Sequence, residues 1–265
     1  MLGMWPIAIN NKRAAVNGLR MLLMLFVLMA STSLNAQVLR MAANVWPPYT
    51  DQRLPEDGLS VDLIRTALGR AGYQVEYVEV PWERALQGLR QGRYDLINDW
   101  TTTTHAAYAR YGRAFLTNRV RWVQRRGEHF RYEGRGSLIP YRIVLSRGYV
   151  YSDELATDSR LNKGYAANFV QAARMLLAGR ADLTLEDEQT ARFHFGRELS
   201  DVENLLQFVP GEFANLDLSL VVRNDHPQQA QIIAAFDREI EAMLADGSYA
   251  AIFLRHGLPA PQRLP

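Results

Sequence analysis

Short apolar runs alternate with longer stretches of helical spacing along the first third of the chain after residue 37. Residues 38–44, 74–80 and 94–98 are short and largely apolar, which predicts three strands. Residues 58–72 and 82–90 place apolar side chains three and four apart, which predicts helices that end near glycine. This β-α-β-α-β order favours a parallel, doubly wound sheet.

The same pattern continues to the end of the chain with two kinds of element. Strands are predicted at 119–126, 141–145, 181–185 and 218–223, and a loop rich in glycine and charge at 127–136. Helices are predicted at 168–178, 187–195 and 227–245, with a further short helix over 108–115. A sequence of helix, Gly-Arg-x-Asp and strand occurs twice, at residues 89–95 and 176–182, and indicates two similarly built α/β halves.

The first 36 residues differ in character from everything that follows. Their only charges are Lys12, Arg13 and Arg20, and a run of ten apolar residues over 21–30 leads into small and polar residues ending at Ala36. This order is typical of a secretory signal peptide, so residues 1–36 are predicted to be one, with cleavage after Ala36. An uncleaved anchor or a buried helix is the alternative, although the run is short for a membrane span.

Composition and charge exclude several classes of partner and of functional site. The net charge of +2 becomes −1 without the first 36 residues, because 27 basic and 28 acidic residues remain, so a nucleic-acid partner is not expected. The chain has no cysteine, which excludes disulfides, thiolate metal sites and cysteine nucleophiles. Its five histidines show no metal-ligand spacing and are predicted to be scattered on the surface. No metal, cofactor or catalytic motif is predicted.

Several short segments, each weak alone, stand in a telling order and spacing. They are Trp46-Pro47-Pro48-Tyr49, residues 58–63, residues 81–85, Gly92-Arg93-Tyr94-Asp95, the threonines 101–104, residues 179–182 with 186–188, residues 220–223 and residues 246–249. Together they resemble the bacterial extracellular solute-binding proteins of family 3, the periplasmic amino-acid-binding components of ABC transporters, over residues 38–257. The resemblance implies the type II periplasmic-binding-protein fold, an α/β architecture of two lobes, each a mostly parallel sheet flanked by helices, joined by two hinge strands.

Domain limits follow from the resemblance. Lobe 1 is expected over residues 38–121 plus 221–257 and lobe 2 over 125–211. The hinge strands are expected at 120–123 and 218–223. Residues 258–265 hold prolines and are expected to form a loose C-terminal tail.

A buried amino acid needs an anion for its ammonium group and a cation or helix N-terminus for its carboxylate. The resemblance implies that Asp187 binds the ammonium, and an N-terminal helix carboxylate is the alternative reading of Asp187. The family's carboxylate-binding arginine falls on Ala107 here. Arg110, about one helical turn later, is the expected replacement, Arg113 is a second possibility, and a surface arginine is the alternative reading of Arg110. The lack of an arginine at the family position puts a plain α-amino acid in question as the ligand.

The threonine run offers an anion site at a predicted helix start, through Thr101 and Thr102 among others. Asp99 beside the cleft would favour a cationic or amine-bearing ligand. Ordinary helix capping and a loop aspartate are the alternatives.

Aromatic side chains are expected to wall the cleft. Tyr49 and Trp100 are predicted cleft residues, Trp82 is a candidate with core packing as the alternative, and Trp46 stays open between the two. The loop Arg147-Gly148-Tyr149-Val150-Tyr151 follows a predicted strand of lobe 2, and its glycine would let backbone amides approach a ligand. Tyr149 or Tyr151 is expected to close over the ligand, and a tight turn with packed tyrosines at its flanks is the alternative.

These features together predict a monomeric periplasmic protein that binds a small polar ligand, an amino acid or a relative, and delivers it to an ABC permease without catalysis. Two alternatives remain open: a ligand-sensing module for a membrane receptor, and an exported dehydratase-like enzyme on the same fold.

Overall fold

The computed structural model describes residues 36–102 and 105–265. The predicted signal peptide lies almost wholly outside the described residues, and so do Thr103 and Thr104 of the threonine run. No helix in the described part is both long and apolar enough to cross a membrane.

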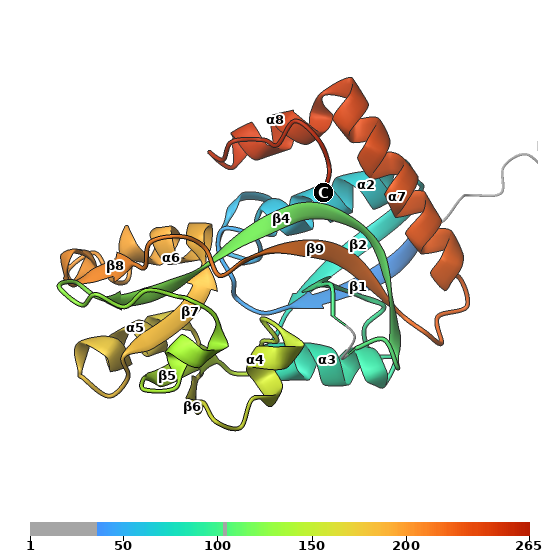
Figure 1. The fold of residues 1–265 in the computed structure, drawn as a ribbon. Coiled ribbons are helices and arrows are strands. Elements are labelled where there is room, and N and C mark those ends of the chain that lie inside the picture. The colour runs from blue at the N-terminus through green and yellow to red at the C-terminus, as the bar shows by residue number, and fades with distance from the viewer. Residues whose placement is uncertain (1–35, 103–104) are drawn as a thin grey trace, which may run out of the picture. The chain divides into compact units, whose positions relative to one another are not determined.

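The described strands form a single sheet in the order β2-β1-β3-β9-β4-β7-β5-β6, and β8 pairs with β4 (Figure 1). Their bounds are β1 Gln37–Ala43, β2 Tyr73–Glu79, β3 Leu96–Trp100, β4 Ala109–Arg125, β5 Arg142–Ser146, β6 Asn162–Ala166, β7 Leu183–Asp187, β8 Leu206–Phe208 and β9 Ala214–Arg223.

The sheet has a parallel group at each end. β1 pairs in parallel with β2 and β3, and β5 pairs in parallel with β6 and β7. We call the half with β1 to β3 lobe 1 and the half with β5 to β8 lobe 2. The antiparallel strands β4 and β9 join the two, as expected of two hinge strands, because β9 pairs with β3 while β4 pairs with β7. The exact lobe limits stay predictions.

Strand β4 corrects the predicted helix over residues 108–115. This segment is extended and pairs with β9 from Ala109 onward. The register shifts between Tyr111 and Ala114 and again between Ala114 and Leu116, so bulges interrupt the alternation of faces. The apolar residues therefore recur at irregular intervals that imitate helical spacing.

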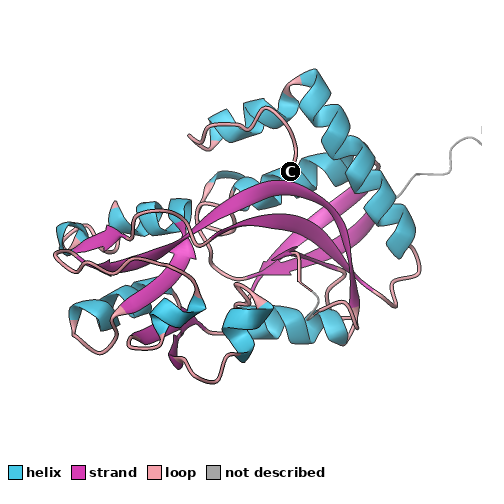
Figure 2. Cartoon of the chain, viewed as in Figure 1, coloured by secondary structure: helices cyan, strands magenta, loops and turns pink. Residues whose placement is uncertain are grey.

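Helices cover both lobes (Figure 2). Their bounds are α2 Leu59–Arg70, α3 Trp82–Arg90, α4 Asp153–Thr157, α5 Phe169–Leu177, α6 Glu188–Phe195, α7 Gln229–Asp246 and α8 Ser248–Arg255, with short 3-10 turns at Pro55–Asp57, Arg135–Leu138 and Glu203–Leu205.

Each lobe buries its own apolar side chains. In lobe 1, α2 and α7 lie side by side, and Leu63, Ile64 and Phe236 are fully buried. In lobe 2, Phe169 and Leu176 of α5 pack with Val123 and Val144 of the sheet. The two cores hold the strand ends that carry the polar residues described below.

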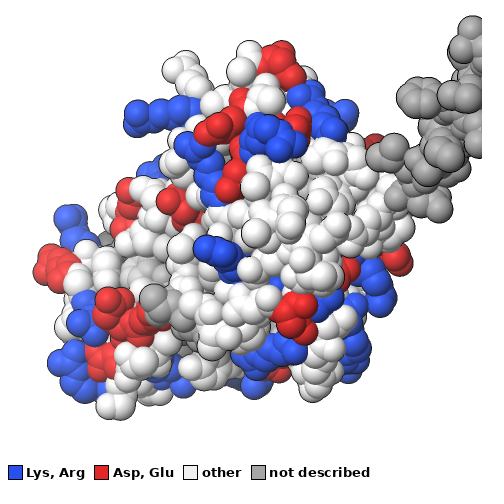
Figure 3. All heavy atoms as spheres, turned by 90° about the vertical axis from the view of Figure 1, so that its right-hand side faces the viewer, with Lys and Arg blue, Asp and Glu red and all other residues white. Residues whose placement is uncertain are grey.

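The C-terminal segment 258–265 has no helix or strand. Leu258 and Leu264 nevertheless pack against the apolar core as partly buried residues. On the face of the molecule in Figure 3, Lys and Arg are interspersed with Asp and Glu around an uncharged central area.

Candidate ligand cleft between the lobes

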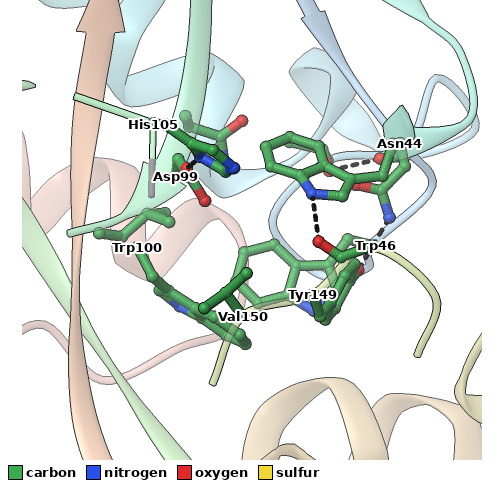
Figure 4. A pocket seen from close by; sticks show the side chains of 12 residues that line it. Asn44, Trp46, Asp99, Trp100, His105, Tyr149 and Val150 are labelled. Carbon is green, nitrogen blue, oxygen red and sulfur yellow. Dashed lines mark hydrogen bonds and ion pairs between the residues drawn. The ribbon is translucent and has the colours of Figure 1, made fainter. Parts of the chain in front are cut away.

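Two adjoining hollows lie between the lobes. The smaller one, which we call the inner cavity, leaves about 30 Å³ for the centres of water-sized molecules. The larger one, which we call the outer cleft, leaves about 420 Å³, which is the size range of small-molecule sites. Both are lined by Asn44, Trp46, Trp82 and Tyr149, so they share a wall. The inner cavity is also lined by Thr50, Asn98, Asp99, Trp100, His105, Gly148, Val150 and Leu218 (Figure 4).

The fold brings these residues together from two directions. The parallel strands β1 and β3 end at the same edge of lobe 1, where Asn44 follows β1 and Asp99 and Trp100 end β3. Strand β5 of lobe 2 runs in the opposite direction, and Gly148, which follows it, lines the same cavity. In open α/β sheets, ligands bind in the crevice at the carboxyl ends of the strands. The structure therefore places the cleft where this rule expects it.

Aromatic rings wall the inner cavity. Trp46 and Trp100 meet edge to face with centroids 5.6 Å apart. Tyr149 of lobe 2 meets Trp100 in the same way at 5.7 Å, and Asn44 Nδ2 donates a 2.9 Å hydrogen bond to the Tyr149 hydroxyl. These contacts join the two lobes through side chains that line the cavity (Figure 4).

The glycine of the predicted loop has a steric role. Gly148 has a φ of +81°, and a Cβ there would lie 3.1 Å from the ring of Trp82. Trp82 Nε1 donates a 3.2 Å hydrogen bond to the Gly148 carbonyl. A larger residue at 148 would therefore be strained and would push lobe 2 away from Trp82.

Asp99 is the acidic residue of the inner cavity and is only 9% exposed. Its Oδ2 lies 2.6 Å from His105 Nδ1 and accepts a 3.1 Å hydrogen bond from the Tyr111 hydroxyl. Burial raises the pKa of Asp99 above its usual range, although the hydrogen bond with His105 acts in the opposite direction.

The histidine prediction was wrong for the cleft. His105 is 3% exposed and lines the inner cavity, and His194 and His226 are also buried. Spacing rules for metal ligands could not show this, because the partner of His105 is a single carboxylate. Among residues 36–102 and 105–265, no group of three or more His, Asp or Glu is placed to hold a metal ion.

Asn98 has an unpaired acceptor. The residue is 4% exposed and lines the inner cavity, and its Oδ1 has no hydrogen-bond partner among the described residues. A buried acceptor without a donor is costly, so a donor from the molecule that fills the cavity, water or ligand, would stabilise Asn98.

Asp187 ends β7 and lies in a different environment. Its Oδ1 accepts hydrogen bonds from the backbone N–H groups of Gln189 and Thr190, both at 2.9 Å, and so caps α6. Tyr49 donates to Oδ1 at 3.0 Å, and Asn118 Nδ2 donates to Oδ2 at 3.3 Å. Asp187 is 1% exposed and is not among the residues that line the two hollows.

The neighbouring Glu186 lines the outer cleft. Trp46 Nε1 donates a 3.3 Å hydrogen bond to Glu186 Oε1, so Trp46 and Tyr49 of lobe 1 both reach the end of β7 in lobe 2. Burial raises the pKa of Glu186 to about 8 and that of Asp187 to about 6.

The remaining predicted residues lie apart from the inner cavity. Arg110 is exposed on β4 opposite Val222. Arg147 is exposed and lines the outer cleft. Thr101 Oγ1 lies 3.3 Å from Ser219 Oγ, and Thr102 Oγ1 donates a 3.4 Å hydrogen bond to Asp153 Oδ1. Thr101 and Thr102 do not begin a helix, which corrects that expectation.

Of the predicted site residues, the inner cavity brings together Trp82, Asp99, Trp100, Gly148 and Tyr149. Sequence reasoning missed several of their neighbours. Asn98 adjoins Asp99 in a strand, and no feature of the sequence shows that its Oδ1 lacks a hydrogen-bond partner. The missed lining residues are Asn44, Thr50, Asn98, His105, Val150 and Leu218.

Two α/β lobes joined by two strands, with a cleft at the strand ends, define a solute-binding protein of the periplasmic-binding-protein fold. The chain belongs to the bacterial extracellular solute-binding proteins, family 3, whose family model matches residues 39–258. No curated protein sequence matches the chain.

Solved structures of low sequence identity share this fold. A histidine kinase sensor domain similar to periplasmic binding proteins has a TM-score of 0.73 at 21% identity, covering 86% of this chain and 98% of its own. A mutant of ArgBP from T. maritima has a TM-score of 0.70 at 17% identity, covering 83% and 95%. The ancestral amino-acid-binding protein AncCDT-1, a precursor of cyclohexadienyl dehydratase, has a TM-score of 0.65 at 18% identity, covering 82% and 94%.

Proposed function

We propose that the chain is a periplasmic solute-binding protein that captures a small polar ligand, an amino acid or a related compound, between its lobes. The observation that carries the proposal is the pair of adjoining hollows lined by residues of both lobes, with Asp99 and Trp100 from one lobe and Tyr149 from the other. A ligand held there contacts both lobes at once, so its binding energy favours the closed arrangement.

Delivery to an ABC permease is the proposed role, and a monomer is sufficient for it. The family and the ArgBP likeness support this role. The likeness to a histidine kinase sensor domain supports sensing as the alternative use of the same fold. Crosslinking in the native membrane separates the two roles. Recovery of a permease subunit supports transport, and recovery of a receptor kinase supports sensing.

Ligand binding is tested by thermal unfolding of the protein purified after expression of the full chain. The panel contains the twenty amino acids, simple amines and small organic acids. A ligand at a hundred times its dissociation constant stabilises the folded state by about 2.7 kcal/mol, which raises the midpoint by roughly 5–10 °C for a chain of this size.

A pair of tyrosine variants locates the site. Tyr149→Ala should abolish the shift, because Tyr149 lines both hollows. Tyr165→Ala makes the same change at a side chain that is 48% exposed and should keep the shift. A panel without any shift, or a shift that Tyr149→Ala leaves intact, contradicts the proposal.

An enzymatic role is the second candidate, and Glu186 is the observation that favours it. Its carboxyl group is buried, lines the outer cleft and has its pKa raised to about 8, as a general acid near neutral pH requires. The AncCDT-1 likeness supports the same idea. Incubation of any ligand found above, followed by product analysis, tests it. Turnover that Glu186→Gln abolishes supports an enzyme, and unchanged ligand supports binding alone.

A further inference from the structure

We propose that the inner cavity binds the protonated amine of a ligand that carries no carboxylate, with Asp99 as its counterion. This inference rests on the proposed function and names the ligand class of the same cleft. Three independent features of the described residues support it: the charges that line the hollows, the orphan acceptor of Asn98, and the hydrogen bonds already made by Asp187.

Charge is the first feature. The residues that line the inner cavity include Asp99 and His105, and no Lys or Arg is among them. The outer cleft is lined by Glu79, Glu83 and Glu186 against Arg147, whose side chain is exposed. A buried carboxylate needs a fixed cation or several aligned N–H donors. The lining of the inner cavity therefore suits a cation far better than a carboxylate.

Hydrogen-bond capacity is the second feature. Asn98 Oδ1 is a buried acceptor without a partner and lies in the wall beside Asp99. A protonated amine supplies N–H donors and a positive charge together, so it matches a cavity whose wall holds both an unpaired acceptor and a carboxylate. A quaternary ammonium would leave Asn98 unpaired, so the inference is confined to amines that carry N–H groups.

The aromatic walls strengthen the same preference. Trp46, Trp100 and Tyr149 line the cavity around Asp99 (Figure 4). Cations are attracted to the faces of such rings, and the attraction is greatest where water is excluded. The outer cleft adjoins the inner cavity and has room for the rest of an amine ligand.

The state of Asp187 is the third feature. Asp187 already accepts four hydrogen bonds, three at Oδ1 from Gln189, Thr190 and Tyr49 and one at Oδ2 from Asn118. It is only 1% exposed and does not line either hollow, so an ammonium group in the hollows does not reach it in this arrangement. Asp99, which lines the cavity, is the available carboxylate.

The test compares amino acids with the amines that remain when the α-carboxylate is removed. Isothermal titration calorimetry measures the dissociation constants of agmatine and L-arginine, cadaverine and L-lysine, histamine and L-histidine, and 2-phenylethylamine and L-phenylalanine. At least one amine should bind, and its parent amino acid should bind at least tenfold more weakly.

Matched variants assign the counterion. Asp99→Asn should weaken the amine at least tenfold, because it removes the charge and keeps the shape. Asp201→Asn makes the same change at an exposed carboxylate and should leave the affinity unchanged. Asn98→Leu is a second test in case Asp99→Asn fails to fold, and it should also weaken the binding of the amine at least tenfold.

The outcomes separate this inference from the proposed function. If amino acids bind as tightly as the amines or more tightly, or if both cavity variants keep full amine affinity, the amine inference is overturned while solute binding stands. If no amine, amino acid or organic acid of the combined panels binds, the proposed function fails together with the inference.

Discussion

The ends of β3 and β7 both carry buried carboxylates near the cleft, and the two carboxylates have different surroundings. At the end of β7, Asp187 accepts four hydrogen bonds, and two of the donors are backbone groups of α6. At the end of β3, Asp99 has His105 and Tyr111 at one oxygen and borders a cavity together with the unpaired Asn98. Asp187 thus links the start of α6 and Tyr49 of lobe 1 to the end of β7, whereas Asp99 borders the inner cavity.

This difference teaches that a carboxylate at a family's binding position can also be part of the protein's own hydrogen-bond network. Asp187 occupies the place where the resemblance expects an ammonium-binding aspartate, and it accepts four hydrogen bonds from within the protein. Trp100 Nε1 donates to Asn118 Oδ1 at 2.8 Å, and Asn118 in turn donates to Asp187. Asp187 is thus the end of a chain of hydrogen bonds that begins at the cavity wall of lobe 1.

The largest expected effect is the change in folding stability with pH that Glu186, near the end of β7, causes. The raised pKa of Glu186 means that the folded state keeps a proton that the unfolded state releases above about pH 4.5. The contribution of Glu186 to the free energy of unfolding is therefore greatest below that pH. This contribution falls by on the order of 4 kcal/mol as the pH rises toward 8. Asp187, with its pKa near 6, contributes to the lower part of this window.

Urea unfolding at pH 6 and pH 8 measures the effect of Glu186 separately from that of Asp187. The native protein should lose about 3 kcal/mol between these pH values, and Glu186→Gln should lose much less, since glutamine does not titrate. Equal losses in the two proteins would mean that Glu186 is ionised in the folded state already at pH 6.

The second effect comes from removing the Asp187 carboxylate. Asp187→Ala deletes the cap of α6 and leaves Tyr49 and Asn118 without an acceptor, so the free energy of unfolding should fall by about 3 kcal/mol. Urea unfolding at pH 7 measures it. Asp201→Ala, at an exposed carboxylate, is the control and should stay within about 0.5 kcal/mol. A loss at Asp187 no larger than the control would remove the contrast between the two strand ends.

The third effect isolates the contact between lobes. Tyr49→Phe removes one hydrogen bond to Asp187 and keeps the ring, so stability should fall by about 1 kcal/mol. Because this bond links lobe 1 to lobe 2, the radius of gyration from small-angle X-ray scattering should also increase. Tyr165→Phe, at an exposed ring, should change neither quantity. A stability loss without any increase in radius would show that the bond does not hold the lobes together.

Much of the fold was predictable because most elements have regular spacing. Helix α3 spans Trp82–Arg90, the predicted limits, and α5 and α6 each begin one residue after the predicted start. Strand β6 was missed, since Asn162–Ala166 is short, largely exposed and holds Lys163 and Gly164. The first part of β4 was read as a helix, because its bulges break the two-residue alternation.

The site was less predictable, because contacts across the cleft depend on tertiary structure. Asp99, Trp100 and Gly148 were predicted from their residue types and their positions after predicted strands. All three line the inner cavity. His105 follows a threonine run and has no local pattern, and only the fold places its ring 2.6 Å from Asp99. Arg110 was expected near the cleft on the assumption of a helix, and the strand places it on an exposed edge position instead.

The smallest expected change in stability is at Asp99, and a pair of isosteric variants makes it informative. Asp99→Asn removes a charge that burial disfavours, and the amide oxygen still accepts from His105 and Tyr111. Its free energy of unfolding should therefore stay within about 1 kcal/mol of the native protein, or rise. Asp187→Asn instead turns an N–H donor toward Asn118 Nδ2, which Trp100 holds in place.

Side-by-side urea unfolding of the two variants decides between a structural and a ligand-facing carboxylate. Asp187→Asn should be the less stable by more than about 1 kcal/mol, because its amide opposes a donor in a buried site. If Asp99→Asn proves as unstable as Asp187→Asn, Asp99 also serves chiefly to hold the fold, and the counterion assigned to the cavity loses its distinguishing feature. If only Asp187→Asn is destabilised, the end of β7 is structural and the end of β3 remains the place for a ligand charge.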